Sequence, residues 1–167
     1  MGASLSPRRE RSGQGAIEGW RSIVDEFRTA KSASYRDDRG KLILRLTVAV
    51  LLGFHGVSKL KNGIGWMAGP LRAHHLPMFV GYGVYAAEVV APALLILGIF
   101  TRPAALVIVF DMVMALVLVV QGKAFQIQPQ GGALGAELQF LYLFSALAIA
   151  FLGSGRFAIS KGRGRWD

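Results

Sequence analysis

Residues 76–120 read LPMFVGYGVYAAEVVAPALLILGIFTRPAALVIVFDMVMALVLVV, and this stretch decides the fold. It holds two apolar runs, 76–100 and 103–120, that are continuous rather than alternating, a pattern that favours helices over strands. As a helix, each run is long enough to cross a hydrocarbon core of ~30 Å. Only Glu88 and Asp111 bring charge into the two runs. We therefore expect two neighbouring membrane-spanning helices.

Two further apolar runs, at residues 42–60 and 133–152, flank this stretch. Of the 167 residues, 53% are apolar and 17% are charged, against about 25% charged residues in an ordinary soluble domain. This composition argues against a soluble enzyme, because too many apolar side chains would face water, and against a disordered chain, which needs low hydrophobicity. We expect an all-α fold, a four-helix transmembrane bundle.

The distribution of basic residues predicts the orientation. Fifteen of the 19 Lys and Arg residues lie within residues 1–45, at Arg102 in the turn between the second and third runs, and in the tail 156–167. Because cytoplasmic loops are rich in Lys and Arg, we expect a multi-pass protein of the inner (cytoplasmic) membrane with both termini in the cytoplasm. The net charge of +9 then reflects orientation and attraction to membrane lipid, not nucleic-acid binding.

The chain divides into a leader (1–41), a membrane domain (42–155) and a basic tail (156–167). Within the leader, apolar side chains recur at helical spacing over about residues 16–31, and charged side chains occupy the opposite face. The apolar positions are Ile17, Trp20, Ile23, Val24 and Phe27. We expect an amphipathic interfacial helix on the inner leaflet, the alternative being a loosely ordered tail. Because the first apolar run begins near residue 42, it is expected to act as an uncleaved anchor.

Ionisable side chains inside the spans are the candidate functional residues. Glu88 lies about midway along its span, Asp111 near the middle of the next, and Glu137 in the first turn of the last. His55 and Lys59 are four residues apart, so they share one helix face in the outer half of the first span. A charge at mid-span costs roughly 2.5–3.5 kcal/mol, which requires pairing or water. We expect His55, Lys59, Glu88 and Glu137 to converge on one polar pocket in the outer half of the bundle. Asp111 is assigned to the same pocket, the alternatives being a pair across the bundle or a protonated acid.

Two structural interpretations stay open beside a functional one. Lys59 and Glu137 can form an outward-facing ion pair, and Glu88 can be a neutral, hydrogen-bonded core acid. Pro92 favours a special role for Glu88, because a proline lacks the N–H that would bond the carbonyl of Glu88, and the helix is expected to kink there. Tyr85, three residues before Glu88, lies on the same face and is expected to hydrogen-bond to it.

The chain carries no cysteine, which excludes disulfides, thiol catalysis and Fe–S clusters within it. It also has no haem-attachment motif, no flavin or nucleotide fingerprint, and no metal motif. His74 and His75 are adjacent in an outer loop, but a second set of ligands is missing, so we expect no metal site. Any redox chemistry must therefore use an electron carrier from outside the chain.

Four short motifs, in order along the chain, resemble the DoxX family. They are Gly56-Val57-Ser58-Lys59-Leu60, the stretch 88–102 that ends in Thr-Arg, the run 137–142, and the closing Gly153-Ser154-Gly155-Arg156. The resemblance covers roughly residues 42–161 and departs from many relatives at Ala91-Pro92. It implies a small four-helix inner-membrane protein. The founding members are subunits of thiosulfate:quinone oxidoreductase, and related bacterial proteins are linked to membrane oxidoreductase complexes that handle oxidative and thiol stress.

From this resemblance and the intramembrane charges we expect a quinone-linked oxidoreductase subunit. Glu88 would supply a proton and Lys59 would stabilise negative charge, and the quinone would be bound without a covalent link. The remaining pocket residues are expected to be His55, Tyr85, Glu137, Asp111 and Trp66. The expected partners are membrane lipid and a soluble or membrane redox protein, and the oligomeric state, including a homo-oligomer, stays open. The alternative is a non-enzymatic membrane scaffold or small-molecule carrier in a stress-response complex.

Overall fold

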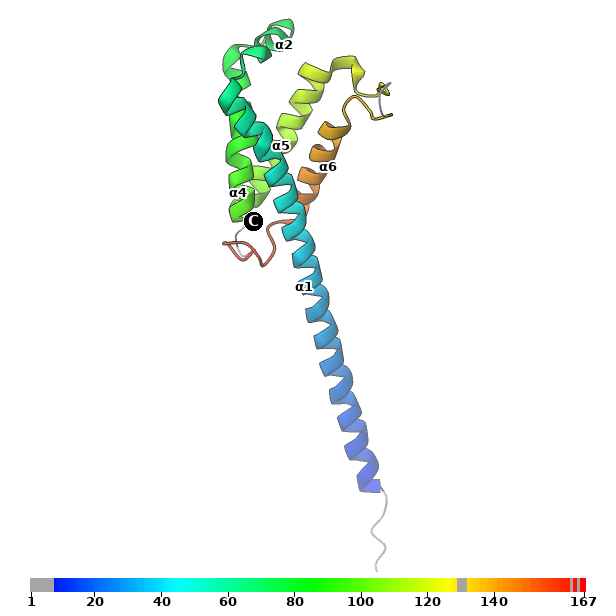
Figure 1. The fold of residues 1–167 in the computed structure, drawn as a ribbon. Helices are drawn as coiled ribbons and strands as arrows, with labels where there is room; N and C mark the ends of the chain where they lie inside the picture. Colours follow the sequence, from blue (N-terminus) through cyan, green and yellow to red (C-terminus); the bar gives the residue numbers. More distant parts are fainter. Residues whose placement is uncertain (1–7, 129–131, 163, 165) are drawn as a thin grey trace, which may run out of the picture. The chain divides into compact units, whose positions relative to one another are not determined.

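A computed structural model describes residues 8–128, 132–162, 164 and 166–167. Within these residues the only extended pairing is an isolated antiparallel bridge between Ile127 and Leu134, so the expected all-α fold is confirmed. The chain forms two compact units, Met1–Asp37 and Asp38–Asp167. The second unit holds the helices that position the candidate site (Figure 1).

The elements follow the apolar runs of the sequence. Helix α1 (Arg8–Asn62) is followed by η1 (Gly65–Met67) and α2 (Ala68–Ala73). The second apolar helix is built from η2 (Met78–Tyr82), α3 (Gly83–Tyr85), η3 (Ala86–Val90) and α4 (Ala91–Leu97). The third is built from α5 (Thr101–Ala115), η4 (Leu116–Val120) and η5 (Gln121–Lys123), and the last is α6 (Glu137–Leu152).

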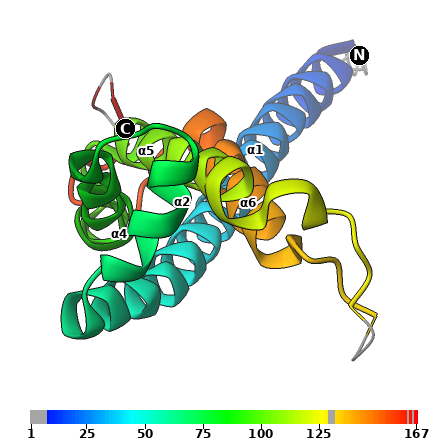
Figure 2. The same cartoon turned by 90° about the horizontal axis from the view of Figure 1, so that it is seen from above.

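Three helices of the described chain are long and apolar enough to cross a membrane, Ser34–Asn62, Met78–Leu97 and Thr101–Lys123. Helix α6 is a shorter apolar helix. It packs along α5, and α4 packs against α5 from another side (Figure 2). These four apolar segments are those of a helical membrane bundle, as the hydropathy predicts.

The core of the second unit is made mostly of aliphatic and small side chains. Ala49 on α1, Ala105 on α5 and Ala146 on α6 are fully buried in one cluster. Alanine at such positions lets helix backbones approach closely, which is how helices associate in a membrane where the lipid is as apolar as the side chains. Tyr142 and Met112 belong to the same cluster and extend it toward the site described below.

Helix α1 contains both the predicted amphipathic segment and the first predicted span. In the first unit, Trp20 and Phe27 are 69% and 71% exposed, so this apolar face is not covered by other described residues. The side chain of Ile17, predicted to belong to the same face, lies outside the described residues. Placement of this segment in the membrane interface stays a prediction.

The buried side chain of Arg45 holds the C-terminal tail against the bundle. Its Nη1 donates to the carbonyl of Ser154 at 2.8 Å and its Nη2 to the carbonyl of Phe157 at 2.9 Å. The tail can turn back because Gly153 and Gly155 adopt φ values of 73° and 69°, in the left-handed region that suits glycine. The closing Gly-Ser-Gly-Arg motif therefore forms the bend that brings the carbonyls of Ser154 and the following Phe157 to Arg45.

Candidate functional site

The centre of the site is an ion pair between Lys59 and Glu88. Lys59, in the last turn of α1, donates from Nζ to Oε1 of Glu88 on η3. The side chains are 20% and 6% exposed, so the carboxylate is the more deeply buried partner. A carboxylate removed from water needs a charge partner, and Lys59 provides it.

The local backbone explains why the two side chains meet. Residues Ala86–Val90 form a π-helical turn, in which the N–H of Ala91 bonds to the carbonyl of Ala86. Pro92 follows at the start of α4 and has no N–H to offer, so the predicted distortion at Glu88 takes the form of this wider turn. Single π-turns inside helices often occur at functional sites.

Gly56 provides the close approach of α1 to this turn. A Cβ built at Gly56 would collide with the backbone carbonyl of Glu88 and would lie 2.9 Å from Cγ2 of Val89. Only glycine fits this contact without moving one of the helices. Lys59 lies three residues beyond Gly56, on the neighbouring part of the same helix face, which places its ammonium opposite the carboxylate.

A cavity of about 130 Å³ lies beside the ion pair. Its polar and aromatic lining residues are His55, Lys59, Trp66, Glu88, Gln139 and Tyr142, and its apolar ones are Leu52, Met112, Ala115, Val119 and Leu138. The ring of His55 meets that of Tyr142 edge-on, with centroids 6.0 Å apart. The ammonium of Lys59 lies 5.9 Å from the ring centroid of Trp66, within cation–π range.

One oxygen of the ion pair has no hydrogen-bond partner. Oε2 of Glu88 is buried, and none of the described residues donates to it. Buried polar atoms in folded proteins are almost always satisfied, and an unsatisfied one costs about 1–3 kcal/mol or more when charged. Water, a proton or a ligand in the adjoining cavity can satisfy this oxygen.

Four predicted site residues meet at this cavity: His55, Lys59, Trp66 and Glu88. Tyr85 lies next to it but does not bond to Glu88 as predicted. Its hydroxyl donates instead to the backbone carbonyl of Lys59 at 3.3 Å. The hydroxyl of Tyr85 therefore supports the end of α1 rather than the carboxylate.

Glu137 and Asp111 lie elsewhere. Glu137 is exposed in the first turn of α6, where Oε2 accepts from the backbone N–H of Leu134 at 3.2 Å. The ion pair between Glu137 and Lys59 is not formed. Lys59 pairs with Glu88 instead, and Glu137 accepts a hydrogen bond from the loop before its own helix. Asp111 is half-buried and lines a separate cavity of about 70 Å³. Of the predicted ionisable side chains, His55, Lys59 and Glu88 therefore line the pocket, and Glu137 and Asp111 do not.

Among the polar residues of the cavity, sequence reasoning missed two, Gln139 and Tyr142. They are three residues apart on α6, so they share a helix face, and this spacing in an otherwise apolar run was the available signal. Tyr142 is buried and contacts His55 on α1, which links the two helices across the cavity.

No cluster of three or more His, Cys, Asp or Glu residues close enough to hold a metal ion occurs in the part of the chain that the structure describes. What the arrangement offers chemically is a buried carboxylate, an ammonium, an imidazole and a phenol around a small space. Such a set can hold a neutral or anionic group by hydrogen bonds and can exchange protons with it.

Comparison with known proteins gives two matches. The sequence profile of the DoxX family matches residues 40–121, which include Lys59, Trp66 and Glu88. An uncharacterized protein of Haemophilus influenzae is 38% identical over 119 residues, covering 71% of this chain and 86% of that protein. No solved structure matches.

Proposed function

The chain belongs to the DoxX family and is a membrane protein, and we propose that its ion-paired cavity binds the ring of a quinone within an oxidoreductase. The observation that carries the proposal is the buried oxygen of Glu88, Oε2, which lacks a partner among the described residues and belongs to a residue lining a ring-sized cavity. We further propose that the membrane is the inner one, with both termini in the cytoplasm.

The size of the cavity suits one ring. An apolar cavity of about 150 Å³ holds a benzene molecule, and this cavity has about 130 Å³. Pockets that enclose whole drug-sized ligands are larger, about 300–1,000 Å³. A bare six-membered ring is therefore about the size of the cavity, and the ring substituents and hydrophobic tail of a quinone have to remain outside it, among the apolar helices or lipid.

The polar lining suits the oxygens of such a ring. A quinone oxygen accepts hydrogen bonds, and Lys59, His55 and Tyr142 each carry a donor. A reduced ring carries hydroxyl groups that donate, and Oε2 of Glu88 is an acceptor without a partner in the described chain. The same cavity can therefore bind both redox forms of the ring.

When bound, a quinone supplies two-electron, two-proton redox chemistry. Within the chain, Glu88 holds or releases a proton at Oε2, and Lys59 balances the charge of the carboxylate at Oε1. The ring of Trp66 lies within cation–π range of the ammonium and stabilises its charge. Because the chain has no cysteine, the electrons come from outside it, from a reduced substrate or a redox partner protein.

The second candidate function is a non-enzymatic scaffold or carrier in the membrane. It is favoured by the close contact at Gly56, because this contact and the ion pair together join α1 to η3 and so stabilise the bundle. The exposed apolar face of the first unit, with Trp20 and Phe27, offers such a scaffold a surface for another protein.

Quinone binding to the purified protein separates the two functions. One sample of the detergent-solubilised full chain is extracted with organic solvent to detect quinone that co-purifies with it. A short-chain quinone is titrated into separate, unextracted samples of wild type, Glu88→Gln, Lys59→Met and the exposed control Lys61→Met. We expect saturable binding by wild type and the control, and about tenfold weaker binding by Glu88→Gln, the value of one charged hydrogen bond. A protein that yields no quinone on extraction and binds none in the titration contradicts the proposal and leaves the scaffold.

A further inference from the structure

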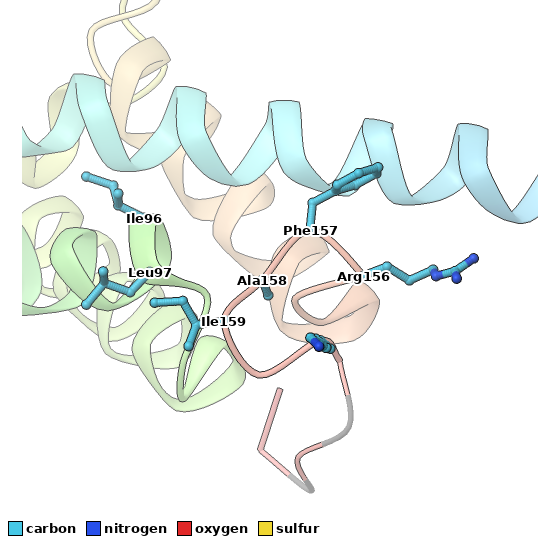
Figure 3. A pocket seen from close by; sticks show the side chains of 7 residues that line it. Ile96, Leu97, Arg156, Phe157, Ala158 and Ile159 are labelled. Atoms are coloured by element: carbon cyan, nitrogen blue, oxygen red, sulfur yellow. The ribbon is translucent and has the colours of Figure 1, made fainter.

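We propose that a second cavity, where α4 meets the C-terminal tail, binds the phosphate headgroup of an anionic phospholipid. The cavity has a volume of about 570 Å³ (Figure 3). Its apolar lining consists of Ile96, Leu97, Phe157, Ala158 and Ile159, and its two charged lining residues are Arg156 and Lys161. This site is separate from the quinone cavity and does not depend on it.

The walls of this cavity are held in place by hydrogen bonds between the tail and the C-terminal end of α4, and between the tail and α1. The N–H of Ile159 donates to the carbonyl of Leu97 at 3.1 Å, and the hydroxyl of Ser160 donates to the carbonyl of Gly98 at 2.8 Å. On the other side, Arg45 binds the carbonyls of Ser154 and Phe157. The cavity is therefore a built feature of the fold rather than a gap beside a loose tail.

The position of the cavity favours a lipid over a soluble ligand. The membrane-length segment Met78–Leu97 ends at the cavity, so the cavity lies where the hydrocarbon core gives way to headgroups. Ile96, Leu97 and Ile159 are exposed there, and Figure 3 shows Leu97 and Ile159 facing each other between α4 and the tail. A free phosphate ion would gain nothing from these side chains, whereas the first part of an acyl chain can pack on them.

The charge of the lining matches a phosphate. Arg156 and Lys161 are both exposed, and no carboxylate is among the lining residues. Asp38 lies outside the lining, with Oδ2 4.0 Å from Nε of Arg156, so a phosphate would share the guanidinium group with this carboxylate. Figure 3 shows the side chain of Arg156 directed away from Leu97 and Ile159, so its guanidinium group can meet a headgroup at the rim of the cavity. Arginine binds phosphate through two parallel hydrogen bonds and lysine as a point charge, so both residues can contribute to binding one headgroup.

Lipid titration of the full-length protein in detergent, read by native mass spectrometry, tests the site. Each basic residue near an anionic membrane surface contributes about fivefold in affinity. We expect wild type to bind phosphatidylglycerol about 25-fold more tightly than Arg156→Gln/Lys161→Gln, and both to bind phosphatidylcholine equally weakly. The control Arg72→Gln/Lys123→Gln removes two basic residues outside the cavity and is expected to bind phosphatidylglycerol like wild type.

Two further arms make the result decisive. Inorganic phosphate at millimolar concentration should leave the bound phosphatidylglycerol in place, and Ile159→Ser, which alters an exposed apolar position, should weaken its binding. Displacement by phosphate overturns the lipid assignment, as does equal binding of the two lipids by wild type. Retention of wild-type affinity by the double variant overturns the site, and thermal unfolding of each variant confirms that the fold is intact before binding is compared.

Discussion

Lys59→Met breaks the ion pair while keeping an unbranched side chain of similar length. Removing one partner of a buried pair costs about 3–5 kcal/mol, because the other charge stays buried alone, whereas an exposed pair contributes about 0–1 kcal/mol. The side chain of Glu88 is 6% exposed and that of Lys59 is 20% exposed. We therefore expect the lower end of the buried range, a loss of about 3 kcal/mol in the free energy of unfolding.

The double variant Lys59→Met/Glu88→Leu separates the interaction from the packing. Replacing both charges of a buried pair by apolar side chains is often neutral or stabilising, so most of the loss should be recovered. The free energies of wild type, Lys59→Met, Glu88→Leu and the double variant come from unfolding by sodium dodecyl sulfate in mixed micelles, with Lys61→Met as the exposed control from the same turn. A coupling energy between Lys59 and Glu88 below about 0.5 kcal/mol would refute the reasoning, since it would mean that the pair contributes nothing inside the fold.

Three further predictions concern the helix contact, the tail and the orientation. Gly56→Ala should lower the free energy of unfolding by about 1–3 kcal/mol, because its Cβ meets the backbone of η3, whereas Gly53→Ala, with open space around it, should be neutral or stabilising in the same titration. Arg45→Met leaves two tail carbonyls without their donor, so limited trypsin digestion should cleave the tail at Lys161 faster than in wild type. In the cysteine-free chain, a membrane-impermeant maleimide on intact cells should label Lys123→Cys at once and Lys161→Cys only after permeabilisation; the reverse pattern contradicts the proposed orientation.

The helices were predictable from hydropathy, but the start of the first one was not. The apolar run at 42–60 marks where α1 becomes lipid-compatible, and α1 itself begins at Arg8. The linking residues 32–41 contain no proline, and their one glycine, Gly40, a common helix end, lies inside the helix. Hydropathy locates the apolar part of a helix and carries no information about how far a polar extension continues.

The choice of Glu88 as the partner of Lys59 could not be predicted, because a sequence does not show how each helix is rotated about its axis. Position along each span indicated that Lys59, Glu88 and Glu137 lie at similar depth, but rotation of a helix about its own axis follows from packing. Here Gly56 brings one face of α1 against η3, and that contact selects Glu88 over Glu137. The glycine was visible in the motif, yet its partner surface was not.

Arg45 illustrates a second limit. In the sequence it counted as one of the basic residues that set the orientation, and in the structure it is 1% exposed and bound to tail carbonyls. Backbone carbonyls have no sequence signature, since every residue carries one. A buried arginine whose partners are carbonyls more than 100 positions away therefore cannot be recognised before the fold is known.

Photolabelling with an azido-quinone most directly tests the claim that the cavity between Lys59, Glu88 and Tyr142 binds a quinone ring. The full-length protein is labelled in native membranes with and without excess unmodified quinone, digested, and mapped by mass spectrometry. The account predicts competed label in the α1 peptide with His55 and Lys59 and in the α6 peptide with Tyr142, and its loss in Glu88→Gln. Label confined to other segments, or label that excess quinone does not reduce, would contradict it.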